Sequence, residues 1–195
     1  MESIIKSKYR EVTDKRHTEQ LKKIDIYTDT ILIGDSFFER LEWFSKINFN
    51  KNIKILAKGG DTIEHLLWRI ENTPKNNNIK NVILNIGTNN LTNKFNDTQI
   101  NDFINKIYYI IEEIKNIFPN SKIYYLPICF RKDIDKILID KINIKINSNN
   151  NFVFLRNFWS DIIISNGYDV KYFCDNVHLN LNTNMLFYNK ILNII

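Results

Sequence analysis

The 195-residue sequence lacks the features that mark secreted and membrane proteins. Its only 2 cysteines, Cys129 and Cys174, exclude a small scaffold stapled by disulfides, and reduced thiols are expected. No run of about 18 apolar residues occurs, so no transmembrane segment is expected. The N-terminus carries Glu2 and no apolar core of signal-peptide length. We therefore expect a cytoplasmic protein, long enough for one sizeable core and too short for two ordinary domains.

Concentrated charge and cofactor motifs are also missing. The net charge of +5 is spread along the chain, whereas a nucleic-acid partner would require a clustered basic stripe, so no nucleic acid is expected. The metal spacings H-x-x-x-H and C-x-x-C are absent, as are the P-loop and G-x-G-x-x-G. We expect neither a metal nor a nucleotide cofactor.

Glycine is scarce, and its positions are informative. Of 5 glycines, Gly34, Gly59, Gly60 and Gly87 follow apolar runs and only Gly167 lies elsewhere. Glycine permits positive φ and a close approach of the backbone to a ligand, which favours a site built partly from main chain. The alternative is that tight turns between strands and helices need glycine in any case.

Apolar runs of strand length alternate with segments of helical period, a pattern that predicts parallel strands joined by helices. The predicted strands are 30–33, 53–57, 82–86, 122–126 and 152–155. The predicted helices are 37–44, one begun by Thr62, 100–118, 133–147 and 184–194. We expect an α/β fold of three layers, a flavodoxin-like parallel five-stranded sheet of order 2-1-3-4-5 with helices on both faces. Residues 1–28 are predicted to form a polar helical extension, and 29–195 a single domain.

The first strand ends at Gly34, Asp35 and Ser36, just before a helix. Ligands of parallel α/β sheets collect beyond the carboxyl ends of the strands, where the N–H groups of a following helix can hold an anion. Ser36 is therefore a candidate nucleophile. The alternative is that Asp35 or Ser36 is only the N-cap of the helix, a position that both residue types prefer.

The 3 histidines supply one candidate base. His178 follows Asp175 by three residues, close enough for the carboxylate to bond Nδ1 and leave Nε2 facing a hydroxyl. His17 lies in the polar N-terminal segment and His65 in the helix after Thr62. A mechanism through Cys174 is disfavoured, because an unactivated thiol in apolar surroundings is usually inert.

Four short segments of the chain stand out together, and they are Gly34-Asp35-Ser36, Lys58-Gly59-Gly60-Asp61, Gly87-Thr88-Asn89-Asn90 and Asp175-Asn176-Val177-His178. In order and spacing they resemble the conserved blocks of the SGNH (GDSL-type) hydrolases. The residues are most similar to those of the catalytic subunits of intracellular platelet-activating-factor acetylhydrolase, and the resemblance runs from about residue 29 to the C-terminus. Thr183 and Asn184 stand where the family usually has Gly-Tyr, so the start of the last helix is expected to differ.

The resemblance implies a role for each matching residue. Ser36 would be the nucleophile, His178 the general base and then acid, and Asp175 the residue that orients it. The oxyanion would be held by the backbone N–H groups of Ser36 and Gly60 and by the side-chain amide of Asn89. Relatives pair, which implies a homodimer, and relatives of the acetylhydrolase group bind a regulatory subunit.

The function expected from these residues is that of a serine esterase without metal or cofactor. Its substrate would be a short acyl ester, an acetyl ester first of all, of a lipid or a carbohydrate. One alternative is a lipase or thioesterase for longer chains. Another is a non-catalytic interaction module on the same fold, against which the joint presence of all five site residues argues.

Overall fold

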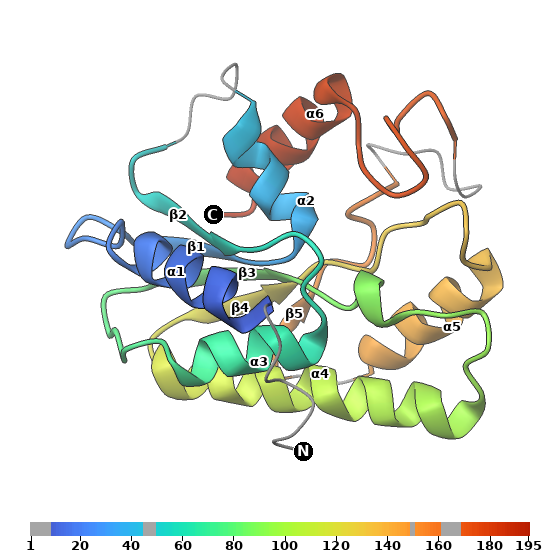
Figure 1. Cartoon of the computed structure of the whole chain (residues 1–195), viewed down its shortest axis with the longest axis horizontal. Coiled ribbons are helices and arrows are strands. Elements are labelled where there is room, and N and C mark those ends of the chain that lie inside the picture. Colours follow the sequence, from blue (N-terminus) through green and yellow to red (C-terminus); the bar gives the residue numbers. More distant parts are fainter. Residues whose placement is uncertain (1–8, 45–49, 149–150, 161–168) are drawn as a thin grey trace.

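The computed structural model describes residues 9–44, 50–148, 151–160 and 169–195, with side chains from residue 14 onward. Within these residues lies one five-stranded parallel sheet of order β2-β1-β3-β4-β5, which confirms the predicted topology (Figure 1). The strands are β1 (Thr30–Gly34), β2 (Ile53–Ala57), β3 (Asn81–Asn85), β4 (Lys122–Tyr125) and β5 (Val153–Phe154).

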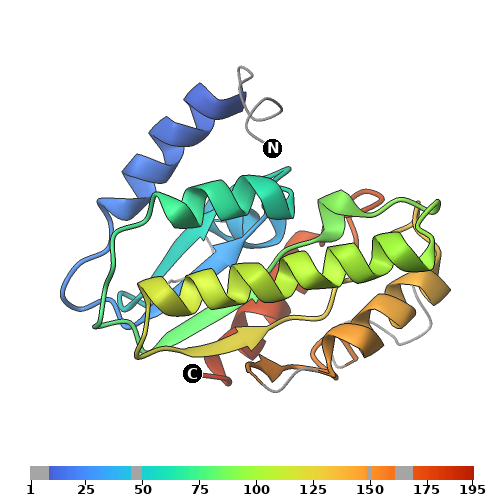
Figure 2. The same cartoon turned by 90° about the horizontal axis from the view of Figure 1, so that it is seen from below.

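Helices cover both faces of this sheet. Figures 1 and 2 show α2 and α6 on one face, and α3 and α4 running across the other. None of the described helices is both long and apolar enough to cross a bilayer. The helices are α1 (Tyr9–Leu21), α2 (Ser36–Glu39), α3 (Ile63–Glu71), α4 (Asp97–Ile117), α5 (Lys136–Ile146) and α6 (Leu181–Leu192), with the short 3-10 turns η1 (Arg40–Trp43) and η2 (Thr88–Asn90).

The strand sequences explain the two layers. Side chains alternate across a strand, so Ile31 and Ile33 of β1 enter the core under α3 and α4, whereas Leu32 enters the core under α2 and α6. All three are fully buried. A strand with both faces covered reads as a continuous apolar run, which is why the strands could be found from the sequence.

An aromatic cluster fixes the short helix α2 to the sheet. Phe38 stacks on Phe187 of α6 at a ring-centroid distance of 5.7 Å, and Phe37 lies 5.8 Å from Trp159. The ring of Trp159 stacks in turn on Phe187 at 5.3 Å. The two residues that follow Ser36 are therefore held in the core, so the position of Ser36 itself is well defined.

Four predicted helices have other bounds in the structure, and in three of them a side-chain cap overrides the apolar pattern. The helix expected over 100–118 is Asp97–Ile117, because Asn96 caps it. The last helix begins at Leu181 and not at 184, since the Oδ1 atom of Asn180 accepts the N–H of Thr183 at 3.0 Å. The helix expected over 133–147 begins at Lys136, after Asp135 has capped it. The helix expected over 37–44 is a single α-turn that continues as the 3-10 turn η1.

The polar N-terminal helix α1 packs beside β2 through polar groups. The Nε2 amide of Gln20 donates to the carbonyl of Ala57 at 2.8 Å, and His17 Nε2 lies 3.2 Å from Thr73 Oγ1, with all of these side chains buried. Burial lowers the pKa of His17 to about 4, helped by the nearby Arg69 cation, so this histidine is neutral at physiological pH. The division of the chain at residue 28 stays a prediction.

Candidate active site

The carboxyl ends of β1, β2 and β3 lie level with one another, because Gly34 pairs with Ala57 on one side and with Asn85 on the other. A β-carbon at Gly34 would lie only 2.0 Å from the carbonyl oxygen of Asn85, so glycine is required where these strands meet. Gly60 needs glycine for a different reason, since its φ is +78°. These three strand ends bring the predicted segments around Ser36, Gly60 and Asn89 to one edge of the sheet.

The structure separates the two roles that the sequence left open for Asp35 and Ser36. Asp35 is the N-cap of α2, and its Oδ1 atom accepts the N–H of Phe37 at 3.1 Å. Ser36 is the first residue of the helix, and its hydroxyl lies 3.0 Å from Nε2 of His178. The capping is done by Asp35, which leaves the Ser36 hydroxyl for the histidine.

The segment 174–178 brings a histidine and a carboxylate to this hydroxyl. His178 Nδ1 lies 2.7 Å from Oδ2 of Asp175, while Oδ1 of Asp175 accepts the backbone N–H groups of Val177 and His178 at 2.8 and 2.7 Å. The turn is closed by Cys174, whose N–H donates to the carbonyl of His178 at 2.8 Å. Ser36, His178 and Asp175, predicted from two distant parts of the chain, therefore form one continuous row of hydrogen bonds.

The electrostatics of Asp175 suit the partner of a base. Partial burial acts to raise its pKa, but the hydrogen bonds from the backbone and ring of His178 and from the backbone of Val177 outweigh this effect and lower the pKa to about 2. The carboxylate is thus ionised at neutral pH and accepts a hydrogen bond from the Nδ1–H group, which leaves the Nε2 lone pair toward Ser36.

The two other predicted oxyanion donors are linked to each other. Asn89 lies in η2, and its Nδ2 amide donates to the carbonyl of Asp61, the residue after Gly60, at 2.9 Å. This bond fixes the amide beside the glycine turn, and a primary amide keeps a second N–H for another acceptor. The N–H of Ser36 belongs to the first turn of a helix, where backbone donors have no acceptor within the helix.

A buried ion pair beneath the site was missed in the sequence. Arg69 of α3 and Asp61 are about 1% and 0% exposed and lie 2.7 Å apart. The guanidinium also donates to the carbonyls of Gly34 at 3.0 Å and Leu56 at 3.1 Å, so it ties the ends of β1 and β2 to the glycine turn. The available signal was the place of Arg69 on the apolar face of α3, three residues after Leu66, where an arginine needs buried partners.

Asp35 carries a second unusual charge. Its side chain is fully buried and its Oδ2 atom has no hydrogen-bond partner, so burial raises its pKa to about 7 against the opposing N–H of Phe37. The negative charge of Asp61 contributes to this rise, and the cation of Arg131 opposes it. A carboxyl that is partly neutral at physiological pH therefore lies directly under the nucleophile.

Other chemistries find little support among the described residues. Burial raises the pKa of the Cys129 thiol far above neutrality, which leaves it inert. No group of three or more His, Cys, Asp and Glu side chains suited to a metal ion occurs in the described part of the chain.

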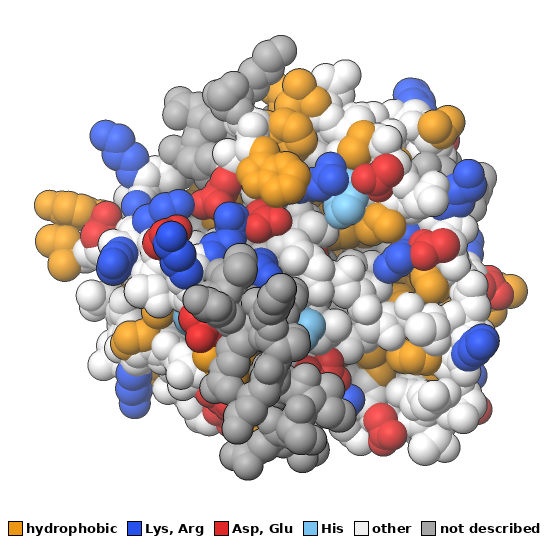
Figure 3. Space-filling model, viewed as in Figure 1, with side chains coloured by type: hydrophobic (Ala, Val, Ile, Leu, Met, Phe, Trp, Pro, Cys, Tyr) orange, Lys and Arg blue, Asp and Glu red, His pale blue; other side chains and the backbone are white. Residues whose placement is uncertain are grey.

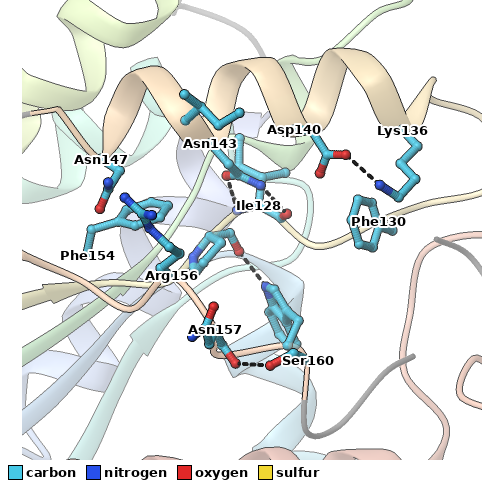
Figure 4. Close-up of a pocket in the computed structure, with 13 residues that line it drawn as sticks. Ile128, Phe130, Lys136, Asp140, Asn143, Asn147, Phe154, Arg156, Asn157 and Ser160 are labelled. Carbon is cyan, nitrogen blue, oxygen red and sulfur yellow. Dashed lines mark hydrogen bonds and ion pairs between the residues drawn. The ribbon is translucent and has the colours of Figure 1, made fainter. Parts of the chain in front are cut away.

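A cavity of about 620 Å³ lies on the far side of the aromatic cluster, between α5 and the segment after β5 (Figure 4). Figure 4 shows the amide of Asn143 bonded to the backbone of Ile128, and Lys136 paired with Asp140 on the same helix. Trp159 lines this cavity and donates to the carbonyl of Pro127 at 2.6 Å. The described residues that line it include none of Ser36, His178 and Asp175.

Comparison with known proteins gives a match in structure and none in sequence. No protein-family model matches the chain, and no curated protein does. A GDSL-like lipase from Bacteroides thetaiotaomicron superposes with a TM-score of 0.70 at 15% identity, covering 93% of this chain and 98% of that one. The chain has the fold of the GDSL-type hydrolases.

Two further solved structures, described in other terms, have the same fold as this chain. A proposed platelet activating factor protein from Streptococcus pneumonia gives a TM-score of 0.74 at 18% identity, over 94% of this chain and 91% of that one. An acetyl xylan esterase gives 0.60 at 18% identity, over 85% and 99%. These likenesses establish the fold that was expected from the sequence blocks.

Proposed function

We propose that this protein is a serine esterase that cleaves short acyl esters. The observation that carries the proposal is the row of hydrogen bonds from Ser36 Oγ through His178 to Asp175, at 3.0 and 2.7 Å. A nucleophile, a base in hydrogen-bond reach and a residue that orients the base are what acyl transfer by serine requires. The GDSL-type fold, whose solved examples include a lipase and an acetyl xylan esterase, supports the same reaction class.

In the first half of the reaction, Ser36 Oγ attacks the ester carbonyl carbon while His178 Nε2 accepts the hydroxyl proton. The carbonyl oxygen becomes an oxyanion, stabilised by the N–H groups of Ser36 and Gly60 and by the Asn89 amide. Collapse of the intermediate breaks the bond to the alcohol oxygen, and the alcohol leaves with the proton held by His178. The acyl group is then bonded to Ser36.

In the second half, His178 Nε2 takes a proton from water as the water attacks the acyl carbon. A second oxyanion forms at the same donors, and its collapse returns the proton to Ser36 and releases the carboxylic acid. Asp175 stays ionised throughout, because its pKa is about 2, and stabilises the imidazolium formed in each half.

The substrate class we propose is an acetyl or similarly short ester of a lipid or carbohydrate. It rests on the resemblance of the site segments to the acetylhydrolase group and on the acetyl xylan esterase among the structural neighbours. A homodimer and a cytoplasmic location stay predictions.

The test compares wild type, Ser36→Ala and a control, Ser148→Ala, on p-nitrophenyl esters of acetate, butyrate, octanoate and palmitate. Ser148 lies after α5, and its hydroxyl bonds only to the local backbone of Lys145 in the described contacts. We expect fast cleavage of acetate, a steep fall with chain length, and loss of turnover in Ser36→Ala alone. Labelling by a fluorophosphonate, which reports an activated serine without a substrate, should follow the same pattern.

Other outcomes are equally decisive. A rate that peaks at octanoate or palmitate would favour the longer-chain lipase or thioesterase. Turnover that survives in Ser36→Ala would refute the assignment of the nucleophile. Failure of wild type to cleave any ester or to react with the fluorophosphonate would favour a non-catalytic module.

A further inference from the structure

Three side chains of the nucleophile's helix follow one line along its surface. Ser36 and Arg40 are four residues apart, which places them on one face of an α-turn. The helix then tightens to the 3-10 turn η1, in which residues three apart eclipse one another, so Trp43 lies directly beyond Arg40. The opposite face, with Phe37, Phe38 and Leu41, is buried in the core. The face of this helix that is not packed in the core therefore runs from the buried Ser36 through the partly buried Arg40 to the exposed Trp43.

The segment 174–178 runs beside this line and contacts it at matching points. Nε2 of His178 lies 3.0 Å from the hydroxyl of Ser36. Further along both segments, Nη2 of Arg40 lies 3.7 Å from Oδ2 of Asp175. The other terminal nitrogen of Arg40 donates to Sγ of Cys174 at 3.3 Å. The guanidinium therefore lies within ion-pair distance of the same carboxylate oxygen that faces Nδ1 of His178, and it donates a hydrogen bond to the residue before it.

Trp43 supports the guanidinium from below. Its ring centroid is 5.3 Å from Cζ of Arg40, within the range of a cation–π contact, although 59% of Trp43 is exposed. Over the position of α2 in Figure 1, Figure 3 shows a hydrophobic side chain in orange adjoining basic, acidic and histidine side chains in blue, red and pale blue. One face of the exposed ring therefore lies against the Arg40 guanidinium.

The segment 174–178 needs such an attachment because its middle is exposed. Phe173 and Leu179 anchor its two ends in the core, while the side chain of Asp175 is 46% exposed. The carbonyl of Asn176 accepts the N–H of Lys132 at 2.9 Å, which holds the segment on the side away from α2. Arg40 holds it on the side of the nucleophile, where a displacement would lengthen the Ser36–His178 contact.

The contact between Arg40 and Asp175 is too long and too exposed to act mainly through charge. Surface ion pairs contribute little because water screens them. A guanidinium is planar and carries its donors in a rigid fork, so it can engage two neighbouring acceptors at once and fix their relative position. Its effect on the site is therefore one of geometry.

We propose that Arg40, supported by Trp43, is a positioning residue that fixes the segment carrying Asp175 and His178 against the helix carrying Ser36. The inference rests on the proposed esterase function of the same site. Arg40 touches no reacting atom, and it acts by keeping Nε2 of His178 within hydrogen-bond reach of the Ser36 hydroxyl. Displacements of about 1 Å at such a contact can lower turnover roughly 100-fold.

The test measures kcat and KM for p-nitrophenyl acetate in wild type, Arg40→Ala, Arg40→Lys and Trp43→Ala. The control is Lys23→Gln, which removes a cation paired with Glu42 of the same turn η1 at 3.2 Å but has no contact with the segment 174–178 in the described structure. In Arg40→Ala we expect kcat to fall about 10- to 100-fold with KM within about twofold. Arg40→Lys should recover only part of the loss, Trp43→Ala should show a smaller loss of the same kind, and Lys23→Gln should match wild type.

Chemical rescue separates positioning from a general loss of structure. Guanidinium chloride at millimolar concentration should restore turnover to Arg40→Ala with saturation, whereas urea at the same concentration should not. The rate of fluorophosphonate labelling of Ser36 should fall and recover in parallel. Thermal unfolding midpoints are recorded for every variant, and if Arg40→Ala fails to fold, Arg40→Lys and Trp43→Ala carry the test.

The outcomes distinguish this proposal from the esterase function. If wild type is active and Ser36→Ala is dead, but the Arg40 variants keep wild-type kcat, the positioning role is wrong and the esterase stands. A loss confined to KM, or a loss of kcat that follows the unfolding midpoint and is not rescued by guanidinium, also overturns it. An inactive wild type refutes the proposed function and this inference with it.

Discussion

The two halves of the site are built in opposite ways. The nucleophile half, around Gly34, Asp35 and Ser36, lies at the end of a fully buried strand, and the core and a buried ion pair hold it. The base half, around Asp175 and His178, lies on a partly exposed segment held by short hydrogen bonds of its own turn. The first half is fixed by the fold as a whole. The second is held by its own turn and by a few contacts from Lys132 and Arg40, and it can be loosened without unfolding the protein.

The carboxyl groups record the same difference. Asp35 has a pKa raised to about 7 because burial removes its charge from water, and Asp175 has a pKa lowered to about 2 because it accepts hydrogen bonds from His178 and Val177. At neutral pH the buried carboxylate of Asp35 lowers the free energy of unfolding, whereas the partly exposed carboxylate of Asp175 orients His178. At this edge of the sheet, the charge of Asp35 thus mainly affects stability, whereas the charge of Asp175 mainly affects the proposed catalysis.

The largest expected effect is on kcat/KM, and it depends on one residue from each half of the site. His178→Ala should lower kcat/KM for p-nitrophenyl acetate by about a million-fold, as far as Ser36→Ala does, because members of a triad act as a unit. The double variant should lose no more than either single one. His65→Gln is the control, since glutamine keeps the capping position that His65 holds at the start of α3. Additive losses in the double variant would show that the two residues act independently.

The next effect should fall on stability and be confined to the nucleophile half. Arg69→Met leaves Asp61 buried without its partner, which should lower the free energy of unfolding by about 3–5 kcal/mol. Urea unfolding at neutral pH measures this, with the exposed Arg156→Met as a control that should stay within about 0.5 kcal/mol. A loss below about 1 kcal/mol for Arg69→Met would mean that the ion pair does not hold the strand ends together.

A smaller effect concerns pH and Asp35. The folded-state pKa is about 7 and the ordinary value is 3.8, so the folded protein binds more protons than the unfolded chain between these values. Stability from this group is therefore complete below about pH 4 and is lost as the pH rises to 7. Asp35→Asn, which keeps a capping oxygen for Phe37, should gain on the order of 2–4 kcal/mol over wild type across this window.

The difference between the two unfolding curves is the quantity to measure for Asp35. His17 has a folded-state pKa of about 4 and an ordinary value of 6.5, so between these values the unfolded chain binds more protons than the folded protein. Its contribution to the free energy of unfolding therefore rises with pH, opposite to that of Asp35, and it does so in both proteins. Subtracting one curve from the other removes that contribution. A difference that is flat between pH 4 and 7 would contradict the raised pKa of Asp35.

Much of the fold could be predicted because the strands are apolar on both faces. The runs around Ile33, Leu56 and Leu84 are continuous, and the helices between them fix the parallel topology. The pair of Asp175 and His178 could also be found, since it lies within one turn of the chain. Its approach to Ser36 came from the resemblance of the blocks and not from any local pattern.

What could not be predicted depends on contacts between distant segments. The place of Arg69 on the apolar face of α3 indicates that it needs buried partners, but only the fold shows that these are carbonyls at the ends of β1 and β2. Arg40 reads as a solvated side chain of a short helix until the segment 174–178 lies beside it. The start of α6 was misplaced because Asn180 acts through its side chain, and in an asparagine-rich chain one such cap does not stand out.

The helix α1 has a consequence for how this chain evolves. Arg16 pairs with Glu39 at 3.0 Å, and Glu39 in turn accepts the N–H of Gly59 at 2.9 Å, beside the glycine whose N–H we assign to the oxyanion. The helix α1 has no reacting group, yet its Arg16 is connected through Glu39 to the residue next to Gly60. Among descendants of this sequence, substitutions at position 16 should co-vary with those at position 39, and lineages that lose the helix should also lose the acid.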